Sequence, residues 1–169
     1  MLLADFADPT ETARWRSVGD IVMGGQSAST MLAGDRIGVF AGTVSLASGG
    51  GFASVRRRDH RVDLSAYDHI ALWLRGDGHR YKLNLRDASA FDGVVYQAPF
   101  ETQPGICQVV RMELATFAPR YRGRPASGTL DPTRVCSLGL LIADRQAGPF
   151  RLELSTIEAR RALERSQSE

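Results

Sequence analysis

Residues 79–86, His-Arg-Tyr-Lys-Leu-Asn-Leu-Arg, decide the fold more clearly than any other stretch of this sequence. Their apolar side chains recur at every second position and alternate with polar ones, which is the pattern of a β-strand with one solvated face. Residues 70–74, Ile-Ala-Leu-Trp-Leu, are apolar throughout and indicate a more buried strand. Between them lies Arg-Gly-Asp-Gly at 75–78, and Asp-Gly favours a tight turn between paired strands. We therefore predict a β-hairpin over residues 69–86.

The same two-residue period recurs in short segments along most of the chain. Further strands are predicted over 36–40, 43–47, 52–56, 94–100, 108–112, 135–143 and 150–155. A short helix is predicted over Asp8–Trp15, where Asp-Pro favours a helix start, and a crossing loop over 118–132. Many short strands separated by Gly, Pro, Asp and Ser turns are typical of an all-β sandwich. We expect one domain over residues 1–160, followed by a frayed tail over 161–169.

The composition is that of a globular protein without a strong charge bias. The 21 basic and 19 acidic side chains leave a formal charge of +2, which is too small to favour nucleic acid as a partner. The basic residues are all Arg except Lys82, which reflects either codon usage or anion recognition. Two cysteines are too few for a disulfide scaffold. No transmembrane segment or secretion signal is recognisable, so we expect a cytoplasmic protein.

Sequence motifs for catalysis, metal binding and cofactor binding are missing. The three histidines and two cysteines do not show the spacing of metal ligands. The glycine clusters lack the Lys-Ser or Lys-Thr of a phosphate-binding loop, and the serines lack the surroundings of an activated nucleophile. We therefore expect no catalytic residue, no metal, no cofactor and no enzymatic activity. Two alternatives stay open, a structural calcium ion and a hydrolase in which Asp20, Asp77 and Asp144 meet in space.

A glycine-rich loop over residues 20–27 is the first candidate for a contact surface. Gly24 and Gly25 would expose backbone N–H groups to an anion or a peptide carbonyl. Asp20 and Ser27 would orient the loop around them. The alternative is a tight turn in which the glycines meet a backbone requirement and Met23 closes one end of the sandwich.

Two other regions supply candidate binding residues. Arg56 follows a run of glycines and would either pair with the carboxylate of Asp20 or Asp77, or face a ligand. Tyr121, Arg122 and Arg124 combine aromatic and basic groups in the crossing loop, which suits phosphate or an acidic partner. A solvated loop without a ligand is the alternative for these three residues.

The glycine-rich motifs occur in a specific order along the chain. They are Asp-x-x-Met-Gly-Gly-x-Ser at 20–27, Gly-Gly-Phe-Ala-Ser-Val-Arg at 50–56, Arg-Gly-Asp-Gly at 75–78, Arg-Gly-Arg at 122–124 and Gly-Pro-Phe at 148–150. Each motif is short, but their ordered combination resembles the complex I intermediate-associated protein family, from Trp15 to about Ile157. The resemblance implies a galactose-binding-like jelly-roll β-sandwich.

The resemblance also implies a function. Eukaryotic members of the family are mitochondrial factors that help to assemble respiratory complex I as chaperones. This chain departs from the family pattern at Cys107, where Trp is frequent, and at Glu113-Leu114, where Pro-Phe is usual. It also lacks a mitochondrial presequence, which favours a bacterial copy. We expect a protein-binding or chaperone-like module, whose partner is unidentified and includes respiratory-complex subunits among the candidates. The alternative is a carbohydrate or other small-ligand-binding module.

Overall fold

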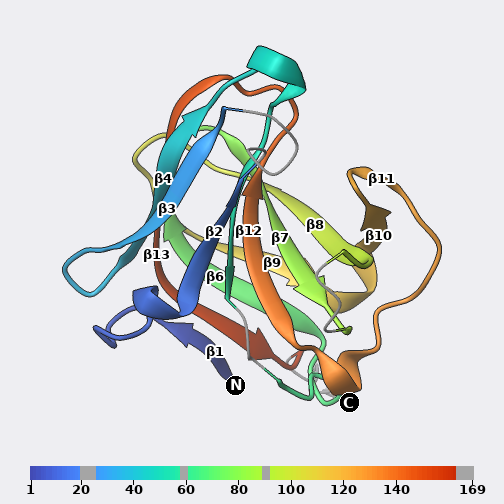
Figure 1. Ribbon diagram of the computed structural model, residues 1–169. Helices are drawn as coiled ribbons and strands as arrows, with labels where there is room; N and C mark the ends of the chain where they lie inside the picture. The colour runs from blue at the N-terminus through green and yellow to red at the C-terminus, as the bar shows by residue number, and fades with distance from the viewer. Residues whose placement is uncertain (20–25, 58–60, 89–91, 163–169) are drawn as a thin grey trace.

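The computed structural model describes residues 1–19, 26–57, 61–88 and 92–162. These residues form two antiparallel sheets, one of six strands and one of seven, which pack face to face (Figure 1). The prediction of an all-β sandwich is confirmed. No helix in the described part of the chain is long and apolar enough to cross a membrane. The predicted division into a domain and a tail stays a prediction, because residues 163–169 lie outside the described ranges.

The six-stranded sheet has β13 as its central strand. Its order is β3 (Ala28–Ala33), β4 (Gly38–Val44), β13 (Gly148–Arg160), β6 (His69–Arg75) and β9 (Cys107–Glu113), and β1 (Leu2–Asp5) also pairs with β13. β13 is long enough to pair with β4 along its first half and with β1 along its second half, while β6 follows its other edge.

The seven-stranded sheet is built around β7 and β12. Its order is β11 (Arg124–Pro125), β10 (Ala118–Tyr121), β8 (Val95–Glu101), β7 (Arg80–Arg86), β12 (Ser137–Ile142), β5 (Ala53–Arg57) and β2 (Trp15–Gly19). Short 3-10 turns lie between strands of the two sheets at Thr12–Arg14, Ala47–Gly49 and Leu114–Thr116. Another, at Pro132–Arg134, lies between β11 and β12 of the seven-stranded sheet.

The hairpin predicted over residues 69–86 is wrong, although both of its strands exist. β6 pairs with β9 and β13 in the six-stranded sheet, whereas β7 pairs with β8 and β12 in the seven-stranded sheet. The turn at 75–78 therefore crosses from one sheet to the other. The Asp-Gly pair does mark a sharp turn, but the periodicity of one segment does not determine which strand lies beside it.

The carboxylate of Asp77 links the two sheets at this crossing. It accepts hydrogen bonds from the backbone N–H of His79 at 3.1 Å and from the hydroxyl of Tyr81 at 3.0 Å, beside the start of β7. It also accepts the backbone N–H of Arg151 in β13, at 2.7 Å. Asp77 thus ties three points of the chain that belong to different sheets.

An aromatic cluster joins the two layers in the core. Tyr81 stacks on Phe100 within the seven-stranded sheet, with ring centroids 5.9 Å apart. From the six-stranded sheet, Phe40 and Phe150 lie 4.9 Å apart, and both meet the edge of the Tyr81 ring. Because Tyr81 and Phe40 are completely buried, this cluster excludes water from the space between the sheets.

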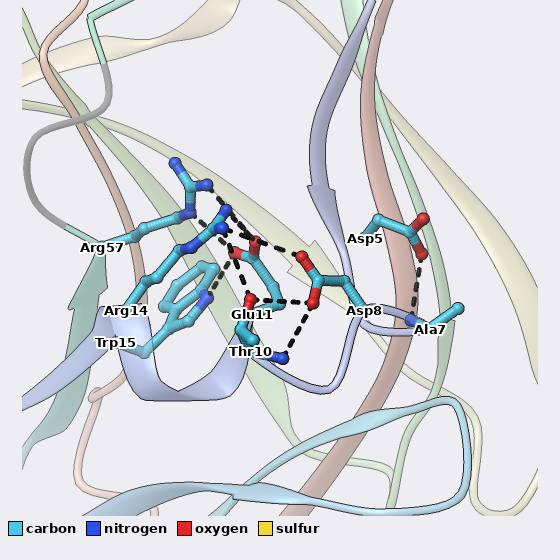
Figure 2. A network of polar contacts seen from close by, with 8 residues as sticks. All are labelled: Asp5, Ala7, Asp8, Thr10, Glu11, Arg14, Trp15 and Arg57. Carbon is cyan, nitrogen blue, oxygen red and sulfur yellow. Dashed lines mark hydrogen bonds and ion pairs between the residues drawn. The ribbon is translucent and has the colours of Figure 1, made fainter.

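A buried ion pair between Glu11 and Arg57 belongs to a small polar network (Figure 2). The carboxylate of Glu11, 2% exposed, accepts hydrogen bonds from Arg57 Nε at 2.6 Å and from the indole N–H of Trp15 at 3.0 Å. Arg14 adds a contact at 3.2 Å from the solvent side. The network joins the turn before β2 to the end of β5.

Three other predictions about elements need correction. Asp8–Trp15 is not a helix beyond the 3-10 turn at 12–14, because β2 begins at Trp15, whose ring is required in the core. The segment 118–132 is not only a loop, since β10 and β11 form a small hairpin in it. The two strands predicted over 36–47 are the single strand β4, which runs through Gly42. There β4 pairs with β3, and a Cβ on Gly42 would lie 2.0 Å from the carbonyl oxygen of Ala28.

Candidate binding site on the outer face of the seven-stranded sheet

The period of two in β7 and β8 sends polar side chains to the outer face of the seven-stranded sheet. Leu83 and Leu85 turn inward and are buried, so the residues between them turn outward. The outward pairs opposite one another in register are Arg80–Glu101, Lys82–Pro99 and Asn84–Gln97. This outer face therefore displays charges and carboxamides, in contrast to the apolar inner face.

The strands β7, β8 and β10 run side by side (Figure 1). An open cleft of about 540 Å³ lies on the outer face of these strands. Its charged and amide-bearing lining residues are Arg80, Lys82, Gln97, Glu101, Arg120 and Asp144. Pro99, Ala118 and the rim of Phe100 supply the apolar part of the lining. The volume falls within the range of small-ligand sites, about 300–1,000 Å³.

The loop after β12 is held rigidly against one end of this cleft. The carboxamide of Gln146 accepts the backbone N–H of Arg80 at 2.9 Å and donates to the carbonyl of the same residue at 2.8 Å. It also donates to the carbonyl of Ala143 at 2.8 Å. Gln146 therefore imitates a neighbouring strand for one residue of β7, and the loop cannot move without breaking these bonds.

The same loop contains two strained residues. Asp144 and Arg145 have φ angles of 62° and 57°, a region that non-glycine residues occupy at a cost of about 1–3 kcal/mol each. This conformation places the Asp144 carboxylate 3.0 Å from Lys82 Nζ and 3.6 Å from Arg80 Nε. The strain therefore accompanies a carboxylate that is fixed at the mouth of the cleft.

The charges in the cleft do not balance one another. Arg80 and Lys82 share Asp144, and Glu101 lies opposite Arg80 in register. Arg120, in contrast, has no ion-pair partner among the residues that the structure describes. The cleft thus combines the ion-paired carboxylate of Asp144 with an uncompensated guanidinium, which suits a ligand that carries negative charge and hydrogen-bonding groups.

No aromatic ring is displayed for stacking among the residues that line the cleft. Phe100 is buried, and its ring stacks on Tyr81 in the core. Burial, together with the negative charge of Asp77, raises the pKa of Tyr81, so its hydroxyl stays protonated and donates to Asp77. The rings of Phe100 and Tyr81 are therefore part of the hydrophobic core and are not available to stack on a ligand.

The glycine-rich loop predicted as a contact surface falls largely outside the described residues. This holds for Asp20, Met23, Gly24 and Gly25. Ser27 is described and buried, and its hydroxyl both donates to the carbonyl of Ser45 at 3.2 Å and accepts the N–H of that residue at 2.9 Å. Ser27 thus joins the start of β3 to the end of β4, which is a structural role.

Arg56 and Asp77 lie in different parts of the molecule. Arg56 is on the outer face of β5, in register between Arg16 and Gly139. Asp77 is at the crossing between the sheets. Burial raises the pKa of Asp77, but the hydrogen bonds from Arg151, His79 and Tyr81 outweigh this effect and bring the pKa below its ordinary value. Asp77 therefore remains ionised as a structural acceptor.

Tyr121, Arg122 and Arg124 do come together, in the β10–β11 hairpin. Arg122 and Gly123 have φ angles of 47° and 76°, as a two-residue turn of type I′ requires. Both Tyr121 and Arg122 contact the exposed carboxylate of Asp92, and the bond from Arg122 lowers the pKa of that carboxyl group. The Arg-Gly-Arg motif is thus explained by turn geometry and by one surface ion pair.

Apart from Asp144, which was considered only as a hydrolase carboxylate, the residues of the cleft were missed by the sequence interpretation. The signal that could have found them is the polar half of the alternation in residues 79–86, which was taken only as a solvated face. The acid pair considered for a hydrolase is not formed by the two described aspartates, because Asp77 and Asp144 contact separate partners. Among the described residues, no three His, Cys, Asp or Glu side chains gather as metal ligands.

Comparison with solved structures defines the class of fold. The family 11 carbohydrate-binding module of a cellulosomal cellulase of Clostridium thermocellum aligns with a TM-score of 0.74 and 17% identity, covering 99% of this chain and 97% of the module. A family 28 module specific for non-crystalline cellulose aligns with a TM-score of 0.56 and 12% identity, over 95% and 93% of the two chains. The protein is thus a galactose-binding-like jelly-roll domain, as the sequence resemblance implied.

Comparison of sequences defines the family. Residues 4–154 match the family described as Complex I intermediate-associated protein 30, so the chain belongs to this family and the predicted resemblance is confirmed. A relative is the mitochondrial Complex I intermediate-associated protein 30 of Drosophila melanogaster, 26% identical over 178 residues. The alignment covers 90% of this chain and 60% of the relative, so the chain spans well under the full length of that protein.

Proposed function

We propose that this domain is a non-enzymatic, protein-binding module of the assembly-factor kind, which holds a polypeptide partner at the cleft on its seven-stranded sheet. Membership of the Complex I intermediate-associated protein family supports this function, and subunits of a respiratory complex are the partner class that the family name suggests. The bacterial origin and the cytoplasmic location expected from the sequence stay predictions.

The observation that supports the cleft as the contact surface is its fixed set of unlike charges. Asp144 lies in the loop that the hydrogen bonds of Gln146 attach to Arg80 of β7. Arg120 has no ion-pair partner among the described residues. Prearranged charges discriminate between partners because a wrong partner leaves a charge unpaired.

Affinity capture from an extract of the native host tests this function. The wild-type chain should retain specific polypeptides. The double variant Lys82→Glu with Arg120→Glu should retain at least about tenfold less of each, because charge reversals at an interface cost several kcal/mol. The matched control is Arg36→Glu with Arg111→Glu, which reverses two exposed arginines outside the cleft lining, one in the turn between β3 and β4 and one on β9.

Folding must be separated from binding in that experiment. The neutral pair Lys82→Gln with Arg120→Gln keeps the side-chain size near the original and should give an intermediate loss, with a melting temperature close to that of the wild type. Equal retention by the cleft variants and the control variants, or no specific polypeptide on the wild type, would contradict the proposal.

Carbohydrate binding is the second candidate function, and one observation favours it. The alignment with the family 11 module extends over nearly the full length of both chains, and a module of that family has been solved with a mixed-linked β-1,3-1,4 tetrasaccharide. The absence of a displayed ring in the cleft lining argues against it, since sugar rings commonly stack on aromatic faces. A melting temperature that rises with this tetrasaccharide would favour a sugar ligand.

A further inference from the structure

In the part of the chain that the structure describes, the two sheets end in four strands, and three of these ends are blocked. β2 and β3 lie against each other, and the hydroxyl of Ser17 donates to the carbonyl of Ser29 at 2.7 Å. β11 has only two residues, one of which is Pro125. The fourth end strand, β9, has seven residues, contains neither glycine nor proline, and pairs with β6 without a bulge. A long and regular free edge of this kind is a ready pairing site, which proteins otherwise block.

An apolar strip on the outer face of the six-stranded sheet reaches the free edge of β9. Val109 turns outward on β9 and is 44% exposed. Trp73, opposite it on β6, is half-buried, and the guanidinium of Arg160 lies over its ring, 4.6 Å from the centroid. No strand within the described ranges pairs with β9 beyond Val109. The strip is therefore open where the sheet ends.

Three charged side chains beside this strip have no ion-pair partner among the residues whose positions the structure gives. They are Arg75 at the end of β6 and Arg111 and Glu113 on β9, and all three are exposed. The charged residues on the outer face of β13 differ, because they pair with each other at 2.9–3.0 Å. The ion pairs are thus complete at the centre of this face, whereas unmatched charges of both signs remain near the β9 edge.

Two of these charges, of opposite sign, lie too far apart to pair within one chain. Arg75 lies opposite Cys107 at the beginning of β9, whereas Glu113 lies opposite His69 at the other end of the same pairing. The separation along β6 corresponds to about 20 Å. The guanidinium of Arg75 also extends toward the chain just before β9, since its Nη2 is 3.9 Å from the place that a Cβ on Gly105 would take. A contact between Arg75 and Glu113 therefore requires a second molecule.

We propose that two copies of this chain pair antiparallel through β9 and join their six-stranded sheets into one continuous sheet. The register that pairs all of residues 107–113 places Val110 opposite its own counterpart, on a two-fold axis. In this register, Val109 lies opposite Arg111 of the second copy, whose aliphatic stem covers the apolar strip. The inference goes beyond the proposed function, because the cleft lies on the other sheet.

The same register matches the separated charges. Glu113 of the second copy comes opposite Cys107, and the short side chain of Cys107 leaves Arg75 within reach of the carboxylate. The two-fold axis forms this contact twice, once on each side of Val110. A second copy is therefore the partner that these observations favour, since it supplies both the acid for Arg75 and the base for Glu113 by symmetry.

Sedimentation velocity over a range of protein concentrations tests the proposal. The wild-type chain should form dimers with a dissociation constant of about 1–100 µM, as expected for a small interface. Val109→Lys should raise this constant at least about tenfold, because a lysine on a free edge blocks pairing and would face Arg111 of the second copy. The matched control is Leu32→Lys on β3, which replaces a side chain of similar exposure, 50%, at the other end of the same sheet and should dimerise like the wild type.

A charge exchange identifies the contact between copies. Arg75→Glu and Glu113→Arg should each weaken dimerisation at least about fivefold, because each places like charges together. The double variant should return to within about twofold of the wild type, since the ion pair is restored with its signs exchanged. The two residues lie at opposite ends of the strand pair in one chain, so this recovery reports a contact between two molecules. Far-UV circular dichroism checks that each variant keeps its fold.

Disulfide formation tests the register. Cys107 is exposed, and opposite residues of an antiparallel pair have Cα atoms about 4.5–5.5 Å apart, which a disulfide spans. Glu113→Cys should therefore give a covalent dimer under mild oxidation, and the further change Cys107→Ser should abolish it. Arg111→Cys is the control for register, because Arg111 lies opposite Val109 in the proposed pairing and should form a covalent dimer far more slowly.

Several outcomes would overturn the proposal. These are a wild-type chain that stays monomeric up to about 1 mM, equal dimerisation of Val109→Lys and Leu32→Lys, and a double charge variant that is as weak as its single variants. A monomeric wild type that captures a different polypeptide, which Val109→Lys then loses, would assign the edge to a foreign strand and would also overturn pairing between copies.

Discussion

Glu11 illustrates how a single polar residue can be required inside an apolar sandwich. Its carboxylate is almost completely buried, and the guanidinium of Arg57 and the indole of Trp15 both donate to it (Figure 2). Such a pair adds little net stability over an apolar replacement, but the removal of one partner leaves the other charge uncompensated in a medium of low polarity. The residue is therefore tolerated only as part of its network.

We predict that Glu11→Gln lowers the free energy of unfolding by about 3 kcal/mol, because the charge of Arg57 then loses its balancing carboxylate. Arg14→Ala, which removes the half-exposed member of the network, should cost less than about 1 kcal/mol. Urea unfolding of the three proteins measures both effects. Equal stability of Glu11→Gln and the wild type would show that the buried ion pair is dispensable.

At the level of elements, the crossing between β6 and β7 also depends on one carboxylate and its hydrogen-bond donors. The strands adjoin in sequence but belong to different sheets, so their connection must be held at the corner of the sandwich. Asp77 does this by accepting donors from beside β7 and from β13. The Arg-Gly-Asp-Gly motif is thus explained by the geometry of the corner.

We predict that Asp77→Asn destabilises the protein by about 1–3 kcal/mol at neutral pH, because an amide nitrogen replaces one acceptor oxygen among three donors. The pKa of Asp77 is lowered in the folded state, so its contribution is fully present above about pH 4 and is lost as the pH falls through the folded-state pKa. The difference in melting temperature between wild type and variant should therefore shrink in acid. A difference that stays constant down to acidic pH would contradict this role.

Element-level patterns also show what sequence reasoning could reach. β7, β8, β9 and β12 were predicted nearly at their observed bounds, since each has a clear alternation or an apolar run. β2 and β3 were missed because neither has a clear two-residue alternation, and because most of their residues are exposed or half-buried. The helix predicted over Asp8–Trp15 is wrong, because Trp15 begins β2 and its side chain is buried in the core.

At the scale of the whole molecule, one continuous core joins the two sheets. The buried residues of both layers form a single hydrophobic cluster, in which Phe40 and Tyr81 meet across the interface. Neither sheet can keep its inner face covered without the other. The described residues therefore form a single packing unit.

We predict that unfolding in urea is a single transition, with the same midpoint by tryptophan fluorescence and by far-UV circular dichroism. Phe40→Ala, at a fully buried position of β4, should lower both midpoints together and cost about 3–5 kcal/mol. A fluorescence midpoint that separates from the circular dichroism midpoint would show that the two sheets unfold independently.

The sequence by itself determined that this protein is an all-β sandwich of the Complex I intermediate-associated family, because alternation and ordered glycine motifs are local properties of the chain. It did not determine which strands are neighbours. Only the tertiary structure decided that the chain crosses from one sheet to the other at Asp77, between β6 and β7, and that β7, β8 and β10 together form the cleft. The physical reason is that a cleft is made by residues distant in sequence, and their proximity depends on strand order rather than on any local pattern.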